Sequence, residues 1–136
     1  KGSITAFYTV LVAGDDMNEP VADETRSILD GHIVLSRDLA NRGHYPAIDI
    51  SESISRVMST IVDAEHLEAA RKLKEVVAAY EKERDLILIG AYEAGSDPRV
   101  DYAIEKIEEV NSFLKQVVDE KVDFEEAVSQ LKGMFA

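Results

Sequence analysis

Apolar residues follow two different patterns along the chain, and the change comes near residue 60. Before it, residues 4–12 and 32–36 form short continuous runs that are apolar on both faces. Such runs are typical of strands buried in a parallel sheet that helices cover. Between them the sequence predicts an acidic turn at 14–20 and a short helix over 22–29.

From residue 63 onward, apolar positions recur with a helical period. They predict a helix over residues 63–91, with a break expected near Asp85. A second helix is predicted to begin at Asp97, because Pro98 then occupies the first helical position, where proline is favoured.

A last helix is predicted after Asp123, since Glu126 three residues later completes a capping-box pattern. Its expected apolar face consists of Phe124, Ala127, Val128 and Leu131. The chain is therefore predicted to be α+β and mostly α, with a strand-containing part at residues 1–60 and a helical part at 61–136.

Composition narrows the classes of function. The chain has 136 residues, a formal net charge of −12 and no cysteine. Nucleic acid is not an expected partner, because phosphate binding needs a basic face. The apolar runs are too short to span a bilayer, so any membrane association is expected to be peripheral. No metal site is predicted, because the three histidines are scattered without ligand spacing.

Tyr45 is the first candidate for chemistry. It lies in the sequence G-H-Y-P, where Gly43 and Pro46 mark a loop that directs its ring outward. A planar ring held on a loop can stack on a nucleotide base. The alternative is a structural tyrosine that fills a gap beside the strand.

Arg56 is the second candidate. It follows a serine-rich stretch that is predicted to be a polar turn, which suits a guanidinium that reaches across a surface. The alternative is an ordinary surface ion pair with Asp49 or Glu52.

Residues 30–58, DGHIVLSRDLANRGHYPAIDISESISRVM, resemble the hexameric ATPases of flagellar and type III protein export, which are relatives of the rotary ATP synthase head subunits. Upstream, the turn DDMNEP is similar to the export branch rather than to the DDLTDP form of the ATP synthase subunits. Downstream the resemblance continues through LILIGAYEAGSDPRVDYAIEKIEEVNSFLKQ and covers essentially the whole chain. It implies the C-terminal edge of a RecA-like α/β nucleotide-binding domain, followed by a helical C-terminal domain.

The resemblance also implies roles for individual residues. Tyr45 would form one wall of the adenine pocket of its own subunit. The opposite wall follows an F-L-x-Q sequence, found here at residues 113–116; Val118 stands where the family has its first aromatic residue, and Phe124 is a candidate substitute. Arg56, in S-x-S-R, would act in trans as an arginine finger that stabilises phosphoryl transfer on a neighbouring subunit.

The acidic connection at residues 92–98 carries a third implied role. In the rotary relatives, the corresponding helix-turn-helix faces the ring axis and pushes on a central coiled-coil stalk. Glu93, Asp97 and Asp101 would then contact the stalk. The alternative is a solvated turn between two helices.

No G-x-x-x-x-G-K-[ST] phosphate loop occurs in the sequence. The chain is therefore expected to be the C-terminal third of a longer ATP hydrolase that binds ATP and Mg²⁺, and neither is expected to bind tightly to this segment alone. The resemblance implies a homo-hexamer on the cytoplasmic side of the inner membrane, with the stalk protein and export chaperone–cargo complexes as partners. The alternatives are a non-catalytic module that binds a stalk or chaperone–cargo complex, and a fragment of a rotary ATP synthase subunit.

Overall fold

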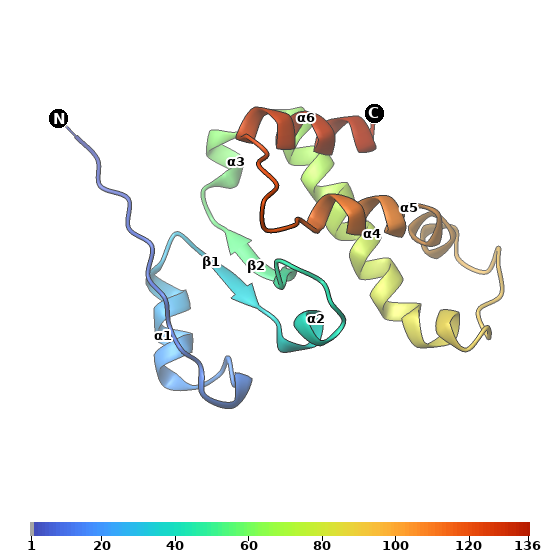
Figure 1. Cartoon of the computed structure of the whole chain (residues 1–136), viewed down its shortest axis with the longest axis horizontal. Helices are drawn as coiled ribbons and strands as arrows, with labels where there is room; N and C mark the ends of the chain where they lie inside the picture. Colours follow the sequence, from blue (N-terminus) through green and yellow to red (C-terminus); the bar gives the residue numbers. More distant parts are fainter. Residues whose placement is uncertain (1) are drawn as a thin grey trace.

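The computed structural model describes residues 2–136 and combines a two-stranded sheet with a helical assembly (Figure 1). The elements, in chain order, are the 3-10 turn η1 (Ala13–Asp15), α1 (Pro20–Ile28), β1 (Gly31–Leu35), α2 (Arg37–Asn41), β2 (Ile48–Ser55), α3 (Met58–Ile61), α4 (Ala64–Leu88), α5 (Pro98–Leu114) and α6 (Phe124–Met134). The fold is α+β and mostly α, as predicted.

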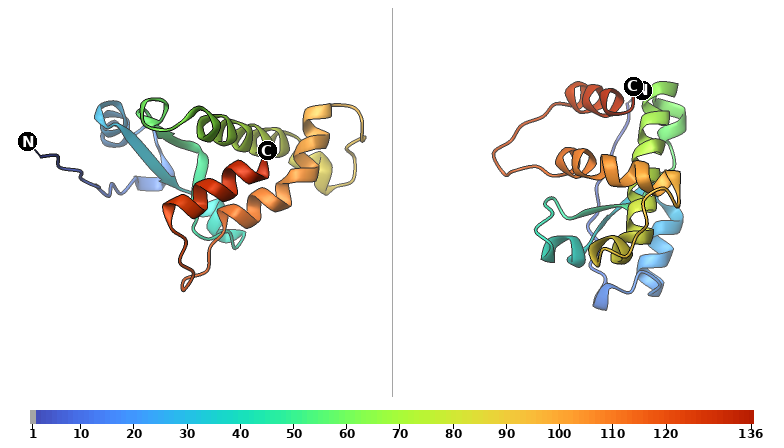
Figure 2. Two further views of the ribbon diagram at one scale, coloured as in Figure 1. Left: turned by 90° about the horizontal axis from the view of Figure 1, so that it is seen from above. Right: turned by 90° about the vertical axis from the view of Figure 1, so that its right-hand side faces the viewer.

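The hydrophobic core lies where α4, α5 and α6 pack together (Figure 2). Ala103 and Val110 on α5 are completely buried at its centre. The rest of this cluster consists of Ala69, Leu73, Val76, Ile107, Leu131, Met134 and Phe135. Ile50 of β2 packs against it, so the helical assembly also supports the strand.

The three predicted helix starts are confirmed. The Asp63, Asp97 and Asp123 carboxylates each accept a hydrogen bond from a backbone N–H in the first turn of the following helix, at 2.8, 2.9 and 2.8 Å. Such N-caps satisfy donors that a helix otherwise leaves unpaired.

The predicted break near Asp85 is wrong, because α4 continues to Leu88. Ile89 is the C-cap of the helix, and the next residue, Gly90, has a φ of +70°. The N–H of Ala91 then reaches back to the carbonyl of Leu86 at 2.8 Å, which is the C-terminal arrangement that glycine favours.

The sheet differs from the prediction. β1 was expected in a buried parallel sheet, but it pairs with β2 in antiparallel fashion, and Ile33 and Leu35 are exposed. Residues 4–12 were expected to form a strand, but they form none, and Figure 1 shows them as an extended coil between the N-terminus and η1. A strand needs a hydrogen-bonding partner along its edge, and the described residues provide none for this segment.

Three polar contacts join the strand-containing part to the helices. Lys74 on α4 donates to the carbonyl of Ser53 at 2.9 Å, and Arg42 pairs with Glu81 on α4 at 3.3 Å. The N–H of Gln116, after α5, donates to the carbonyl of Tyr45 at 2.9 Å. No helix among the described residues is long and apolar enough to cross a membrane.

Candidate functional site

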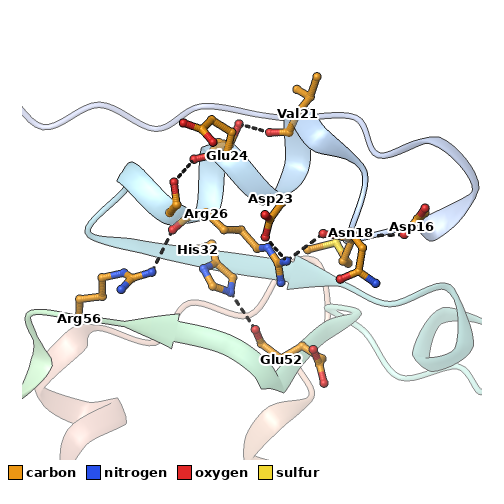
Figure 3. A network of polar contacts seen from close by, with 12 residues as sticks. Asp16, Asn18, Val21, Asp23, Glu24, Arg26, His32, Glu52 and Arg56 are labelled. Carbon is orange, nitrogen blue, oxygen red and sulfur yellow. Dashed lines mark hydrogen bonds and ion pairs between the residues drawn. The ribbon is translucent and has the colours of Figure 1, made fainter.

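Arg56 lies directly after β2 and is exposed. Its guanidinium Nη2 donates to the carbonyl of Arg26 at 3.0 Å, as Figure 3 shows. Its backbone N–H donates to the carbonyl of Asp30 at 2.8 Å. Apart from Arg84, every other arginine in the described part of the chain pairs with a carboxylate; Arg56 does not. The alternative of an ion pair with Asp49 or Glu52 is therefore not what the structure has.

The Asp49 carboxylate is instead engaged within a bulge of β2. The Asp49 carboxylate accepts the backbone N–H groups of Ser51 and Glu52, at 2.9 and 3.1 Å. The hydroxyl of Ser53 accepts from the N–H of Val34 in β1 at 3.0 Å. The stretch predicted to be a polar turn is thus a strand that bulges where these short polar side chains bind its backbone.

The segment that holds Arg56 contains two residues that the sequence interpretation missed. Arg26, in the last turn of α1, donates from Nη2 to the carbonyl of Met17 at 2.9 Å and to the Asp23 carboxylate at 3.2 Å. Gly31 opens β1 at a point where a Cβ would lie 2.6 Å from the carbonyl of Ile54. The available signals were a basic residue at a predicted helix end and a glycine at a strand start.

Tyr45 lies on the loop between α2 and β2, and 58% of its surface is exposed. The preceding residue, His44, is buried and donates its backbone N–H to the carbonyl of Leu39 at 3.0 Å. Burial is the main cause that lowers the pKa of His44, with a smaller contribution from the positive charges of Lys115 and Arg42. The imidazole is thus neutral near pH 7, and the loop presents the Tyr45 ring to solvent.

The segment expected to form the opposite wall reaches Tyr45 through its backbone, since Gln116 binds the Tyr45 carbonyl. Val118 is fully exposed at the tip of the turn that follows. Phe124 is 69% exposed, and its ring lies against His66 with centroids 6.3 Å apart. The structure therefore brings the F-L-x-Q segment beside Tyr45, whereas the aromatic neighbour of Phe124 is on α4.

Tyr45 and Arg56 lie at opposite ends of β2. The paired strand β1 spans Gly31–Leu35, so at a rise of about 3.3 Å per residue the ends of the ladder are roughly 13 Å apart. Both residues lie outside that ladder, one beyond each end. The backbone positions of the two residues are therefore separated by the length of the ladder.

The acidic connection between α4 and α5 is more structured than a solvated turn. The Asp101 carboxylate accepts from the Tyr92 hydroxyl at 3.0 Å and from the N–H of Gly95 at 2.9 Å. Asp97 caps α5 and pairs with Arg99 at 3.1 Å, and this hydrogen bonding lowers its pKa. Glu93 is exposed, and no side-chain hydrogen bond involves it within residues 2–136.

Two family models match the chain. The first is the T3SS EscN ATPase C-terminal domain, over residues 62–133. The second is the nucleotide-binding domain of the ATP synthase alpha/beta family, over residues 1–55.

Relatives and solved structures agree with both matches. The flagellum-specific ATP synthase of Pseudomonas aeruginosa is 53% identical over 99% of this chain and 30% of that protein. The assembled ATPase EscN from the type III secretion system of enteropathogenic E. coli is 47% identical, with a TM-score of 0.94 over 100% of this chain and 33% of that one. EscN in complex with its central stalk EscO is 44% identical, with a TM-score of 0.79 over 86% of this chain and 29% of that one.

The chain thus spans about a third of the length of the relatives that it matches. The resemblance seen in the sequence is confirmed over essentially the whole of this chain. The chain belongs to the family of flagellar and type III secretion ATPases, and comprises an edge of the nucleotide-binding domain followed by the C-terminal domain.

Proposed function

We propose that this chain is the C-terminal part of a hexameric ATPase that energises flagellar or type III protein export. In this proposal Tyr45 stacks on adenine in its own subunit, and Arg56 completes the nucleotide site of a neighbouring subunit. The family membership supports the ATPase assignment, because the matched relatives are named as flagellar and type III secretion ATPases.

The state of Arg56 is the observation that carries this proposal. Its guanidinium is exposed and bound only to an uncharged carbonyl, so its positive charge is not neutralised by a carboxylate among residues 2–136. Phosphoryl transfer builds negative charge on the transferred group, and an available guanidinium stabilises that charge. An arginine held in this manner suits transition-state stabilisation better than a salt-bridged one.

The proposal assigns Tyr45 and Arg56 to two different nucleotide sites. They lie at opposite ends of β2, and the trans role of Arg56 rests on the resemblance of its S-x-S-R sequence to that of the export ATPases. In a ring of identical subunits, each chain then contributes Tyr45 to one interface and Arg56 to the next. Val118 and Phe124 are secondary candidates for the adenine pocket, of which Val118 is nearer in sequence to the Tyr45 contact at Gln116.

ATP and Mg²⁺ belong to this proposal as ligands of the whole protein. The described residues include no group of three His, Asp or Glu side chains that could hold a metal ion. Because the sequence holds no G-x-x-x-x-G-K-[ST] motif, we assign the triphosphate and Mg²⁺ to a phosphate loop elsewhere in the protein, and ATP hydrolysis to the full-length assembly.

The helical part is proposed to contact the central stalk. The structural neighbour EscN has been solved in complex with its stalk EscO, which supports this assignment. Glu93 is the acidic residue of the α4–α5 connection whose side chain is available, whereas Asp97 and Asp101 bind within the connection itself. We propose that Glu93 makes the stalk contact and that the two aspartates shape the connection. Export chaperone–cargo complexes and a cytoplasmic site at the inner-membrane export apparatus complete the proposal.

The experiment that tests the proposal is Arg56→Ala in the full-length ATPase. We expect kcat to fall by roughly 10³–10⁵-fold. KM should stay within about threefold, because the lost contact forms mainly in the transition state. Arg84→Ala is the matched control, since Arg84 also lacks a carboxylate partner among the described residues but lies on α4. An unchanged kcat in Arg56→Ala, at saturating ATP, would exclude the assignment.

A further inference from the structure

Arg56 is bound twice by one short segment, the connection between α1 and β1. Its backbone N–H donates to the carbonyl of Asp30, and its guanidinium donates to the carbonyl of Arg26 (Figure 3). The main chain and the side chain of Arg56 are therefore both hydrogen-bonded to the same short segment. Any shift of this connection would move the guanidinium.

The carbonyl of Arg26 is well suited to hold a guanidinium without neutralising it. It lies in the last turn of α1, where carbonyl groups lack partners within the helix and carry the negative end of the helix dipole. It occupies a single N–H donor of Arg56, so the other donors remain available to phosphate oxygens. A carboxylate at this place would instead compete with the phosphate.

The side chain of Arg26 fixes the position of that carbonyl. Its Nη2 binds the carbonyl of Met17, in the acidic turn before α1, and the carboxylate of Asp23, one turn earlier on the helix. These contacts tie the end of α1 to the turn that precedes it. The Nε of Arg26 is buried and has no hydrogen-bond partner within residues 2–136. A methionine would fill the same space without that desolvation cost, so the two Nη2 contacts are the distinctive feature of arginine here.

Gly31 contributes to the position of Arg56 from the strand side, because it lets β1 and β2 lie close together. A Cβ there would lie 2.6 Å from the carbonyl of Ile54 and 3.3 Å from the Cα of Ser55, which are the two residues before Arg56. Only a residue without a side chain lets β2 approach β1 this closely. The approach sets where β2 ends and Arg56 begins.

We infer that Arg26 is a positioning residue for Arg56, and that the α1–β1 connection holds the guanidinium in the orientation in which it meets a neighbouring subunit's nucleotide. The inference rests on the proposed trans role of Arg56. Arg26 itself does not contact the nucleotide. Its effect on the reaction passes through the backbone carbonyl that it holds in place.

The test is a double-mutant cycle in the full-length ATPase, with Arg26→Met, Arg56→Ala and the double variant. Arg26→Met should lower kcat between about ten- and a hundredfold, as expected for a misplaced catalytic group, with KM within about threefold. In the Arg56→Ala background the same change should lower kcat by less than about twofold, because there is no guanidinium left to position. Arg26→Lys, which retains a cation that can reach one acceptor, should recover part of the loss.

Arg37→Met is the matched control. Arg37 also ties an element to the acidic turn, through Asp15 at 3.3 Å, but it has no contact with Arg56. Its kcat should stay within about twofold of the unsubstituted protein. If Arg26→Met does not assemble, Gly31→Ala replaces it in the cycle, with Gly133→Ala as the control because a Cβ at Gly133 meets nothing within 4 Å.

The outcomes separate the two proposals. Suppose that Arg56→Ala lowers kcat, and that Arg26→Met lowers kcat by the same factor with and without Arg56. Arg26 then acts independently of Arg56, the positioning role is excluded, and the finger assignment stands. An unchanged kcat in Arg26→Met would also exclude the positioning role and leave the finger assignment standing. If Arg56→Ala itself leaves kcat unchanged, both the trans role of Arg56 and the positioning role of Arg26 are excluded.

Discussion

The helical part and the strand-containing part of this chain are held together in different ways. Packed side chains from α4, α5 and α6 bury a continuous apolar core. Within described residues 2–60, Ala22 is the one buried apolar residue, and Tyr45 and Arg56 are held by hydrogen bonds that involve backbone carbonyls. The comparison teaches that substitutions in the first region should cost stability, whereas those in the second should mainly cost activity.

The largest stability effect should come from the helical core. Leu73→Ala should lower the free energy of unfolding of this chain by about 2–5 kcal/mol, because a buried leucine leaves a cavity. Ile33→Ala, on the exposed face of β1, should change it by less than about 0.5 kcal/mol. Chemical denaturation of the two variants measures both values. Equal losses would show that the strand part carries as much of the stability as the helices.

Asp101 should give an intermediate effect. Asp101→Ala removes the acceptor of the Tyr92 hydroxyl and of the Gly95 N–H, and should cost about 1–3 kcal/mol in the same measurement. Glu93→Ala, five residues before the start of α5, should be nearly neutral because its side chain binds nothing in the described chain. If Asp101→Ala left the free energy of unfolding unchanged, the connection would be only a solvated turn.

This result bears on how the stalk contact should be tested. Reversing the charge of Glu93, Asp97 and Asp101 together would disturb the helix cap and the turn as well as the surface. Glu93→Lys alone is the variant that alters surface charge without breaking a described contact. Stalk stimulation of ATPase activity at low and high salt then reports the electrostatic contact, since salt screens exposed charges.

The helical part was predictable because its signals are local. Asp63, Asp97 and Asp123 cap their helices through backbone groups two or three residues away, so a short stretch of sequence contains the whole interaction. β2 was missed for the opposite reason. Its bulge interrupts the alternation of a strand, and Asp49 and Ser53 close that bulge with side-chain bonds typical of a turn.

For the site, the sequence identified the candidate residues but not the contacts that hold them. The sequence pointed to Tyr45 and Arg56 through resemblance, and their roles remain predictions. The contact between Arg56 and Arg26 joins residues 30 positions apart, with β1, α2 and β2 between them in the sequence. No local pattern encodes such a contact, because it depends on how the antiparallel pair returns Arg56 to the end of α1.

At Tyr45, which lies on the surface, the expected effect is on nucleotide affinity and not on stability. In the full-length ATPase, Tyr45→Ser should weaken ATP and GTP binding alike by about 1–3 kcal/mol, since stacking distinguishes bases poorly. Tyr45→Phe keeps the ring and should preserve both affinities. Nucleotide titration measures them, and thermal unfolding provides the control. Equal destabilisation by both changes, with affinity intact, would identify a structural tyrosine.

The central claim is that Arg56 serves a neighbouring subunit, and subunit mixing tests it most directly. One full-length variant carries Arg56→Ala, and the other keeps Arg56 but carries alanine for the lysine of its phosphate loop. Each alone should be inactive. Mixed hexamers should regain ATPase activity, because an intact phosphate loop on one subunit then meets an intact Arg56 on the next. Mixed hexamers that assemble but stay inactive at every ratio would contradict the claim.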